Sequence, residues 1–228
     1  MSPTAETPAN LTPVEARILG VLIEKEKTTP DAYPLTLNSL TAGCNQKTAR
    51  EPVLSISESD IQASLEDLRT RILVFETYGA SGRVLRYAQN FAKVFGLPPA
   101  SVALLATLML RGPQTVSELR ANSERLYRFD DASSVEAYLD ELAERAAGAL
   151  TVKLPKQPGA REHRWQHLLC GAPNRPEEQA EQAKHDASAA AGSTNAALAA
   201  RVSRLEQQVE QLQATVAALA ARDPRHPD

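Results

Sequence analysis

The chain has 228 residues, 43% of them hydrophobic, and a formal net charge of −3. This length allows one or two domains of ordinary size with real hydrophobic cores. The slightly acidic balance excludes a protein whose whole surface is basic, as is usual for dedicated nucleic-acid binders.

Two cysteines, Cys44 and Cys170, are too few and too far apart for a disulfide framework. The first ten residues carry neither the charged start nor the apolar run of a signal peptide. The longest apolar stretch, residues 102–110, is far too short for a membrane span. We therefore expect a soluble, cytoplasmic protein that has no membrane partner.

The first predicted helix begins at Pro13. Thr12 is a good N-cap, proline suits the first helical position, and Glu15 completes a capping box. Apolar residues then recur at helical spacing until the polar stop at residues 28–31. A second, short helix is expected after Thr36.

A third amphipathic helix is predicted from Ser57, and a β-hairpin follows it. Residues 73–78 alternate as a strand, residues 79–82 turn, and residues 84–88 return. The order of three helices followed by a closing hairpin is the winged-helix plan, a variant of the helix-turn-helix.

The same order recurs in the second half of the chain. A helix over residues 102–109 is stopped by Gly112, and Thr115 begins a second helix. Apolar positions from 135 to 146 predict a third helix. Strands are then expected at residues 150–154 and 165–169. This repeat lies in the order of elements and not in residue identity.

We therefore predict a mainly α fold with small β hairpins (α+β), made of two tandem winged-helix domains followed by a C-terminal coiled-coil helix. The predicted segments are a disordered tail (1–10), winged-helix domain 1 (11–90), a linker (91–100), winged-helix domain 2 (101–171), a flexible Ala/Glu/Pro linker (172–195), the coiled coil (196–222) and a tail (223–228).

The coiled coil is predicted from apolar residues at alternating intervals of four and three. These residues are Leu198, Val202, Leu205, Val209, Leu212, Val216 and Leu219. Valine at position a with leucine at position d favours a parallel two-stranded coil, so we expect the chain to form a dimer. Arg201 at position g can meet Glu206 at position e of the second chain. The alternative is an amphipathic helix that packs on its own chain.

The segment LTPVEARILGVLIEKEKTTPDAYPLTLNSLTAGCNQKTAREPV (residues 11–53) resembles the bacterial YceH-like family, whose function is unknown. LMLRGPQTVSELR (residues 108–120) and REHRWQHL (residues 161–168) resemble its second domain. The resemblance spans about residues 11–171, and CNQKT and REPV (residues 44–48 and 50–53) are its most specific part. It implies a tandem winged-helix fold and supplies no reaction, ligand or cofactor.

The sequence contains no motif that predicts an enzyme. A GxxxxGK phosphate loop, HExxH, GxSxG and CxxC are all missing, so we expect no catalytic residue, cofactor or small-molecule ligand. His163, His167 and Cys170 are close in sequence, but ordinary residues of an edge strand explain them better than a metal site. Cys44 is better explained as a small buried residue than as a nucleophile.

Both predicted third helices are acidic, each with four acidic residues and a single arginine. In helix-turn-helix modules this helix enters the major groove, and phosphate attraction dominates DNA affinity. Basic side chains are found instead in the loop before the third helix of the first domain and around the two wings. These candidate contact residues are Lys47, Arg50, Arg83, Arg86, Lys153, Lys156, Arg161 and Arg164. For Arg50, a structural role that ties its loop to a helix end is an alternative.

Two functions remain open at this point. The first is a DNA-associated, transcription-regulator-like dimer that uses its wings and basic loops. The second is a protein–protein interaction scaffold whose winged helices do not bind DNA. The expected partners are therefore a second copy of the chain together with either DNA or a protein.

Overall fold

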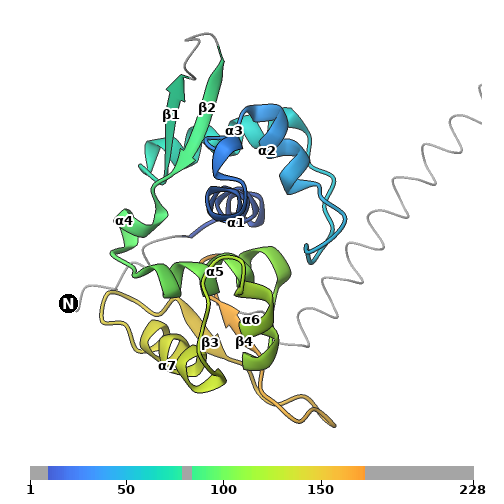
Figure 1. The fold of residues 1–228 in the computed structure, drawn as a ribbon, viewed down its shortest axis with the longest axis vertical. Coiled ribbons are helices and arrows are strands. Elements are labelled where there is room, and N and C mark those ends of the chain that lie inside the picture. The colour runs from blue at the N-terminus through green and yellow to red at the C-terminus, as the bar shows by residue number, and fades with distance from the viewer. Residues whose placement is uncertain (1–9, 79–83, 173–228) are drawn as a thin grey trace, which may run out of the picture. The chain divides into compact units, whose positions relative to one another are not determined.

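The structure is a computed structural model that describes residues 10–78 and 84–172 (Figure 1). Within these residues the fold is mixed α/β, with helices α1 to α7 and two small antiparallel sheets. Arg83 and the predicted coiled coil, with all of its heptad residues, lie outside the described residues. The predicted tails at 1–9 and 223–228 and the linker from 173 to 195 lie outside them as well.

The first half of the described chain consists of three helices followed by a hairpin. Its elements are α1 (Pro13–Thr28), the 3-10 helix η1 (Pro30–Ala32), α2 (Leu37–Cys44), α3 (Glu58–Thr70), β1 (Val74–Tyr78) and β2 (Leu85–Gln89). The expected N-caps are in place: Thr12 forms a full capping box with Glu15. The side chains of Thr36 and Ser57 accept hydrogen bonds from the first turns of α2 and α3.

The second half repeats this order. Its elements are α5 (Pro99–Arg111), α6 (Val116–Ser123), α7 (Ala132–Ala143), β3 (Thr151–Lys153) and β4 (Trp165–His167). Thr115 and Glu118 form a second capping box at the start of α6. Helix α7 ends before the predicted Ala146, because the chain turns at Gly148 and the Leu150 amide donates to the Leu142 carbonyl.

The two sheets are built alike. β1 pairs with β2 so that Glu76 is opposite Tyr87, and β3 pairs with β4 so that Lys153 is opposite Trp165. In each half, the residue before the N-cap of the second helix forms a bridge to the outer side of the second strand: Leu35 to Tyr87 and Gln114 to Trp165. This correspondence between the halves extends the repeat from the order of elements to their hydrogen bonds.

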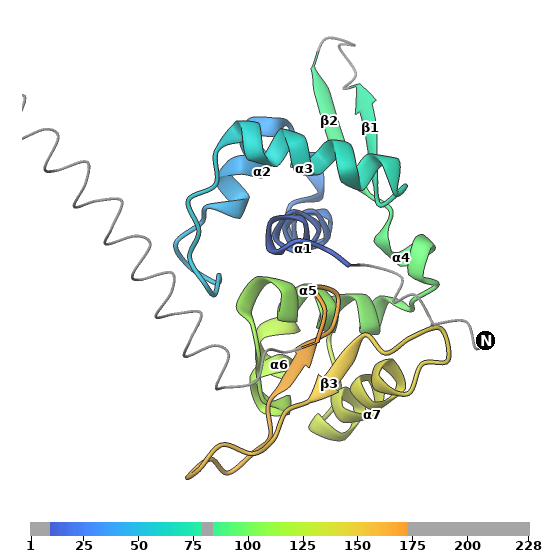
Figure 2. The same cartoon turned by 180° about the vertical axis from the view of Figure 1, so that it is seen from behind.

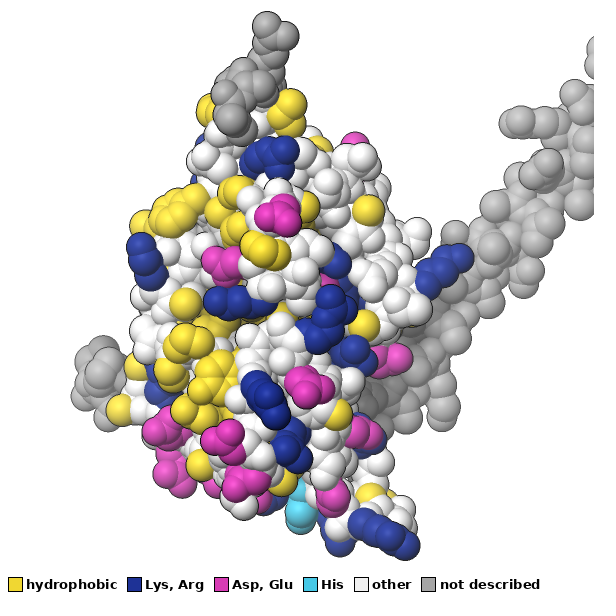
Figure 3. All heavy atoms as spheres, in the orientation of Figure 1, with side chains coloured by type: hydrophobic (Ala, Val, Ile, Leu, Met, Phe, Trp, Pro, Cys, Tyr) yellow, Lys and Arg dark blue, Asp and Glu magenta, His cyan; other side chains and the backbone are white. Residues whose placement is uncertain are grey.

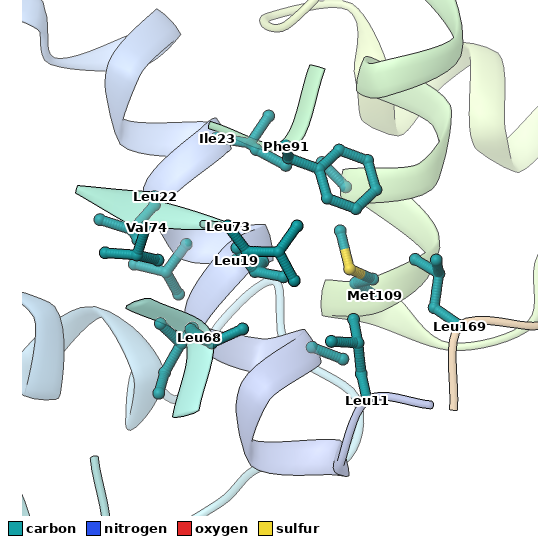
Figure 4. Packing of buried hydrophobic residues seen from close by; sticks show 14 of the residues in the cluster. Leu11, Leu19, Leu22, Ile23, Leu68, Leu73, Val74, Phe91, Met109 and Leu169 are labelled. Carbon is teal, nitrogen blue, oxygen red and sulfur yellow. The ribbon is translucent and has the colours of Figure 1, made fainter. Parts of the chain in front are cut away.

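Helix α5 joins the two halves into one core. All of its residues from Ala100 to Leu110 are buried. Residues such as Val102, Leu105 and Met109 pack into a hydrophobic cluster with α1 and the first hairpin (Figure 4). The opposite face, with Leu104 and Leu108, packs into the cluster of the second half. A helix that buries apolar side chains all round belongs to an interior, so the halves share their central layer.

Helices α1 and α5 pack against each other at the centre of this arrangement (Figures 1 and 2). Gly20 lies at their contact, where a Cβ atom would approach Cγ and Cδ2 of Leu110 to 2.9 Å. The missing side chain of Gly20 therefore allows the two backbones to come close.

Residues 91–100, which the sequence predicts as a linker, carry the short helix α4 (Phe91–Phe95) and the start of α5. Phe91 and Phe95 are buried and stack at a centroid separation of 4.5 Å. The segment is thus anchored in the core by two aromatic rings. In the described part of the chain, no helix combines the length and apolar character needed to cross a membrane.

Candidate functional site

Arg50 lies inside the protein. Its side chain is fully buried, and its guanidinium forms an ion pair with Glu24 of α1, at 2.6 Å between Nη2 and Oε2. Nε donates to the Gly43 carbonyl at 3.2 Å, and Nη1 donates to the carbonyl of Ala49. This placement agrees with the structural alternative for Arg50, because a buried and paired guanidinium is not available to a partner.

A second buried arginine, Arg17 of α1, holds the same loop and was missed by the sequence reasoning. Its Nη1 donates to the Cys44 carbonyl at 3.2 Å and its Nη2 to the Pro52 carbonyl at 2.7 Å. Burial lowers the pKa of Arg17, and the nearby Arg50 lowers it further. A signal was present, because Arg17 directly precedes a long apolar run in the first helix.

The remaining basic candidates of the first half differ in exposure. Lys47 is exposed on the loop between α2 and α3. Arg86 of β2 is half-buried and donates to the Pro34 carbonyl at 2.7 Å, so its guanidinium is tied to the segment before α2. Of these two residues, only Lys47 presents its charge freely on the described surface.

The hairpin of the second half contains two ion-paired cations. The ammonium of Lys153 lies 2.8 Å from Glu136 of α7 and 5.5 Å from the centre of the Trp165 ring. Arg164 forms a two-pronged contact with Glu118 of α6, at 2.9 and 3.0 Å. Exposed pairs of this kind contribute only about 0–1 kcal/mol to stability. Each pair nevertheless places a carboxylate beside the cation and so makes it less available to a partner.

Lys156 and Arg161, in the turn between β3 and β4, are exposed. Neither forms an ion pair with any residue in the ranges 10–78 and 84–172. With Lys47, these are the sequence-predicted cations that the structure leaves exposed and unpaired within those ranges. They are spread over both halves and do not form one cluster.

The acidic residues of the third helices are at the surface. On α3 the exposed acids are Glu58, Asp60, Glu66 and Asp67, and on α7 they are Asp140 and Glu141. Arg69 is the one basic residue within α3, and it is shared between Glu66 and Glu76. Helices α3 and α7 lie at opposite ends of the described fold, with α1 and α5 between them (Figures 1 and 2).

Charge of both signs is mixed on the visible surface. Figure 3 shows Lys and Arg side chains, several of them neighbours near the centre of the face, together with Asp and Glu side chains over the second half of the fold. The nearby carboxylates weaken the attraction of such a surface for a nucleic-acid backbone.

The hairpin of the first half exposes large hydrophobic side chains that the sequence reasoning did not single out. Tyr78 is 67% exposed, and Phe75 and Val84 are each 46% exposed. Ile72, just before β1, is 57% exposed and adopts a positive φ of 59°. Single exposed apolar residues are ordinary, but several on one short hairpin are typical of a surface that contacts another protein.

The described surface has two notable hollows. One, of about 330 Å³, is lined by residues of α6, of the loop after it and of the start of α7, among them Arg120, Arg128 and Phe129. A second, of about 180 Å³, lies between α1, α4 and α5 and is lined mainly by apolar side chains such as Ile23 and Leu97. Both are open to the outside, and neither contains a recognisable catalytic set.

The histidines and cysteines are separated in space and environment. The Nδ1 atom of the exposed His163 contacts the Leu154 carbonyl at 2.9 Å, whereas His167 is half-buried with its Nδ1 atom shielded from solvent. Among the described residues, no three His, Cys, Asp or Glu side chains are grouped as metal ligands would be. Burial raises the pKa of the Cys44 thiol to about 12, which disfavours the nucleophilic thiolate.

Residues 11–160 match the profile of a family described as "Protein of unknown function, DUF480". A UPF0502 protein of Leptothrix cholodnii is 60% identical over 162 residues, which cover 71% of this chain and 72% of the relative. A UPF0502 protein of Burkholderia vietnamiensis is 59% identical over 172 residues, covering 75% and 72%. These matches confirm the resemblance to a family of uncharacterised proteins.

Proposed function

Because the chain belongs to the DUF480 family of proteins of unknown function, its function must be inferred from its geometry, and we propose a non-enzymatic protein–protein interaction adaptor. In this proposal, residues 11–90 and 101–171 are two tandem winged-helix domains. The repeated order of three helices and a hairpin supports this assignment, as does the matching bridge to the second strand of each hairpin.

The observation that carries the proposal is the acidity of both third helices. In a DNA-reading winged helix this element approaches the phosphate-lined major groove. Here α3 exposes four carboxylates and α7 exposes Asp140 and Glu141. Because phosphates and carboxylates repel each other, these helices suit a protein surface better than a duplex.

The basic residues add further support. Arg50 is buried, Arg86 donates to a backbone carbonyl, and Lys153 and Arg164 are ion-paired. Of the candidate contact residues that the structure describes, only Lys47, Lys156 and Arg161 are exposed and outside an ion pair. The exposed Phe75 and Tyr78 offer the apolar, aromatic contact area that is enriched at protein interfaces.

A DNA-associated role is the second candidate, and the second half of the chain favours it. Lys156 and Arg161 are exposed in its wing, and Arg120 and Arg128 line the hollow beside the start of α7. Wings and the first turn of a third helix can contact phosphates without reading bases. In that case binding would depend on these four cations and show little sequence preference.

Self-association through the heptads of residues 198–219 belongs to the same proposal. Pairing of two chains would present two adaptors side by side and raise the effective concentration of a second contact. Substituting Leu205→Arg would place a charge in the apolar seam, so a dimer seen by sedimentation should dissociate into monomers.

The adaptor is tested by recovering partners with the tagged full chain under native conditions after nuclease treatment. A matched variant, Asp60→Asn/Glu66→Gln/Asp67→Asn, keeps the size of the α3 side chains but removes three charges. The proposal predicts that some proteins bind to the wild type and not to the variant. Nuclease treatment should not change which proteins are recovered. Recovery of nucleic acid alone, or of proteins only through nucleic acid, would count against it.

A further inference from the structure

The strand β1 has a free edge whose polar backbone groups can be assigned. Tyr87 of β2 uses its amide and its carbonyl to pair with Leu35, at 2.8 and 3.1 Å. Glu76 lies opposite Tyr87, so its own amide and carbonyl are directed away from β2. No described strand lies on that side of β1. The backbone of Glu76 and, by the period of two, that of Tyr78 therefore face outward along an open edge.

The side chains along this edge favour contact. β1 reads Val-Phe-Glu-Thr-Tyr, a sequence of high β propensity, with Phe75 and Tyr78 exposed on opposite faces. The carboxylate of its single charged residue, Glu76, is drawn to Arg69 of α3 at 3.2 Å and so does not cover the backbone of the edge. Arg69 also pairs with Glu66, so one guanidinium faces two carboxylates and a net negative charge remains beside the strand.

The equivalent strand of the second half gives an internal comparison. β3 has only three residues, and Lys153 occupies the position whose backbone faces outward, opposite Trp165. Short edge strands discourage strand pairing, and the ammonium of Lys153 is drawn to Glu136 of α7. The second hairpin therefore has a short edge strand that discourages pairing. The edge strand of the first hairpin, β1, is longer and carries exposed aromatic side chains.

We propose that β1 accepts an extended segment of a partner protein as an added strand, an inference that rests on the proposed adaptor function. Main-chain hydrogen bonds to Glu76 and Tyr78 provide affinity. The side chains of Phe75 and Tyr78, on opposite faces of β1, contact alternate side chains of the added segment. The partner segment carries β-branched or aromatic residues and a lysine or arginine opposite Glu76. A second copy of β1 fits poorly, because antiparallel self-pairing about Glu76 brings like charges together.

The test is a selection of random dodecapeptides displayed on phage against the immobilised full chain. Selected peptides are synthesised, their affinity is measured, and hydrogen exchange locates the amides they protect. We expect alternating β-branched or aromatic residues with lysine or arginine, and protection of residues 74–78.

Glu76→Pro removes an outward amide without breaking the β1–β2 ladder, so it should weaken binding about tenfold or more. Lys153→Pro, at the matched position of the second wing, should leave binding unchanged.

Thr77→Pro controls for damage to the hairpin, because the Thr77 amide faces β2 and its loss should lower the melting temperature more than Glu76→Pro does. If Glu76→Pro fails to fold, Glu76→Lys leaves the backbone free and should reverse the preference for basic peptides. Peptides that protect α3 or α7 and bind Glu76→Pro normally would overturn strand addition and leave the adaptor function standing. Failure to select any peptide would overturn strand addition alone, whereas failure to recover proteins with the tagged full chain would overturn the adaptor function. If Glu76→Pro abolished self-association, the strand added to β1 would belong to a second copy of the chain. The proposal of a different partner protein would then be wrong.

Discussion

At the scale of single residues, burial decides which cations a partner can reach. The sequence allows a structural role for Arg50 but does not identify its partner. That partner is Glu24 of α1, 26 residues away, and local patterns do not report such distant pairs. The exposure of Lys156 and Arg161, in contrast, follows from their place in a polar turn, and the sequence predicts it well.

Ile72 is a β-branched residue in the left-handed region, at the position after α3 where glycine is favoured. Its φ is 59°, and the Leu73 amide donates to the Leu68 carbonyl, as in a Schellman motif. The left-handed conformation costs a side chain with a Cβ roughly 1–2 kcal/mol. Ile72→Gly should therefore raise the free energy of unfolding by about 1 kcal/mol after its entropic cost. Urea denaturation measures this change in the free energy of unfolding. Ile72→Ala keeps the Cβ atom and should be stabilised less than Ile72→Gly. A glycine variant less stable than the alanine variant would refute the role of the backbone.

His167 couples stability to pH. Burial lowers its pKa from 6.5 to about 4 in the folded protein. The unfolded chain therefore takes up the proton first as the pH falls, and stability is lost between about pH 6.5 and 4. The linked change is at most about 3.4 kcal/mol.

Urea unfolding of the full chain at several pH values measures this loss, and His167→Gln should reduce it. His163→Gln, which alters an exposed ring, is the control and should keep it. An unchanged pH profile in His167→Gln would argue against a buried neutral imidazole.

At the scale of elements, the sequence predicted what local chemistry dictates. The N-caps Thr12, Thr36, Ser57 and Thr115 begin helices as expected, because each side chain meets an amide of the following turn. Helix α4 was missed because five residues are too short for a periodic pattern. The packing of α5 could not be predicted, since an apolar helix without a polar face does not indicate which partner covers each side.

Gly20 tests the contact between α1 and α5. A Cβ here meets Leu110 at 2.9 Å, so Gly20→Val should overpack the helix pair and lower the free energy of unfolding by about 1–3 kcal/mol. Ala63→Val, on the exposed face of α3, introduces the same side chain without crowding and should change stability by less than about 1 kcal/mol. Equal effects of the two substitutions in thermal unfolding would mean that the helices are not in close contact.

At the scale of the whole molecule, the shared core predicts that the two halves unfold together. Trp165 is the only tryptophan and is buried in the second half, so its fluorescence reports that half alone. Far-UV circular dichroism reports all helices. The two signals should give one coincident urea transition, both in the wild type and in Gly20→Val, although Gly20 belongs to the first half. Separate transitions that persist in Leu205→Arg, which disrupts the predicted coiled coil, would show that α5 does not couple the halves.

The central claim is that the tandem domains serve protein contacts and not DNA reading. The most direct measurement is a fluorescence titration of labelled genomic fragments with the full chain, at about 50 and about 200 mM salt. The acidic third helices predict no saturable binding at either concentration. Saturable binding at low salt that weakens by about a thousandfold at high salt, as expected for six or more phosphate contacts, would contradict the account.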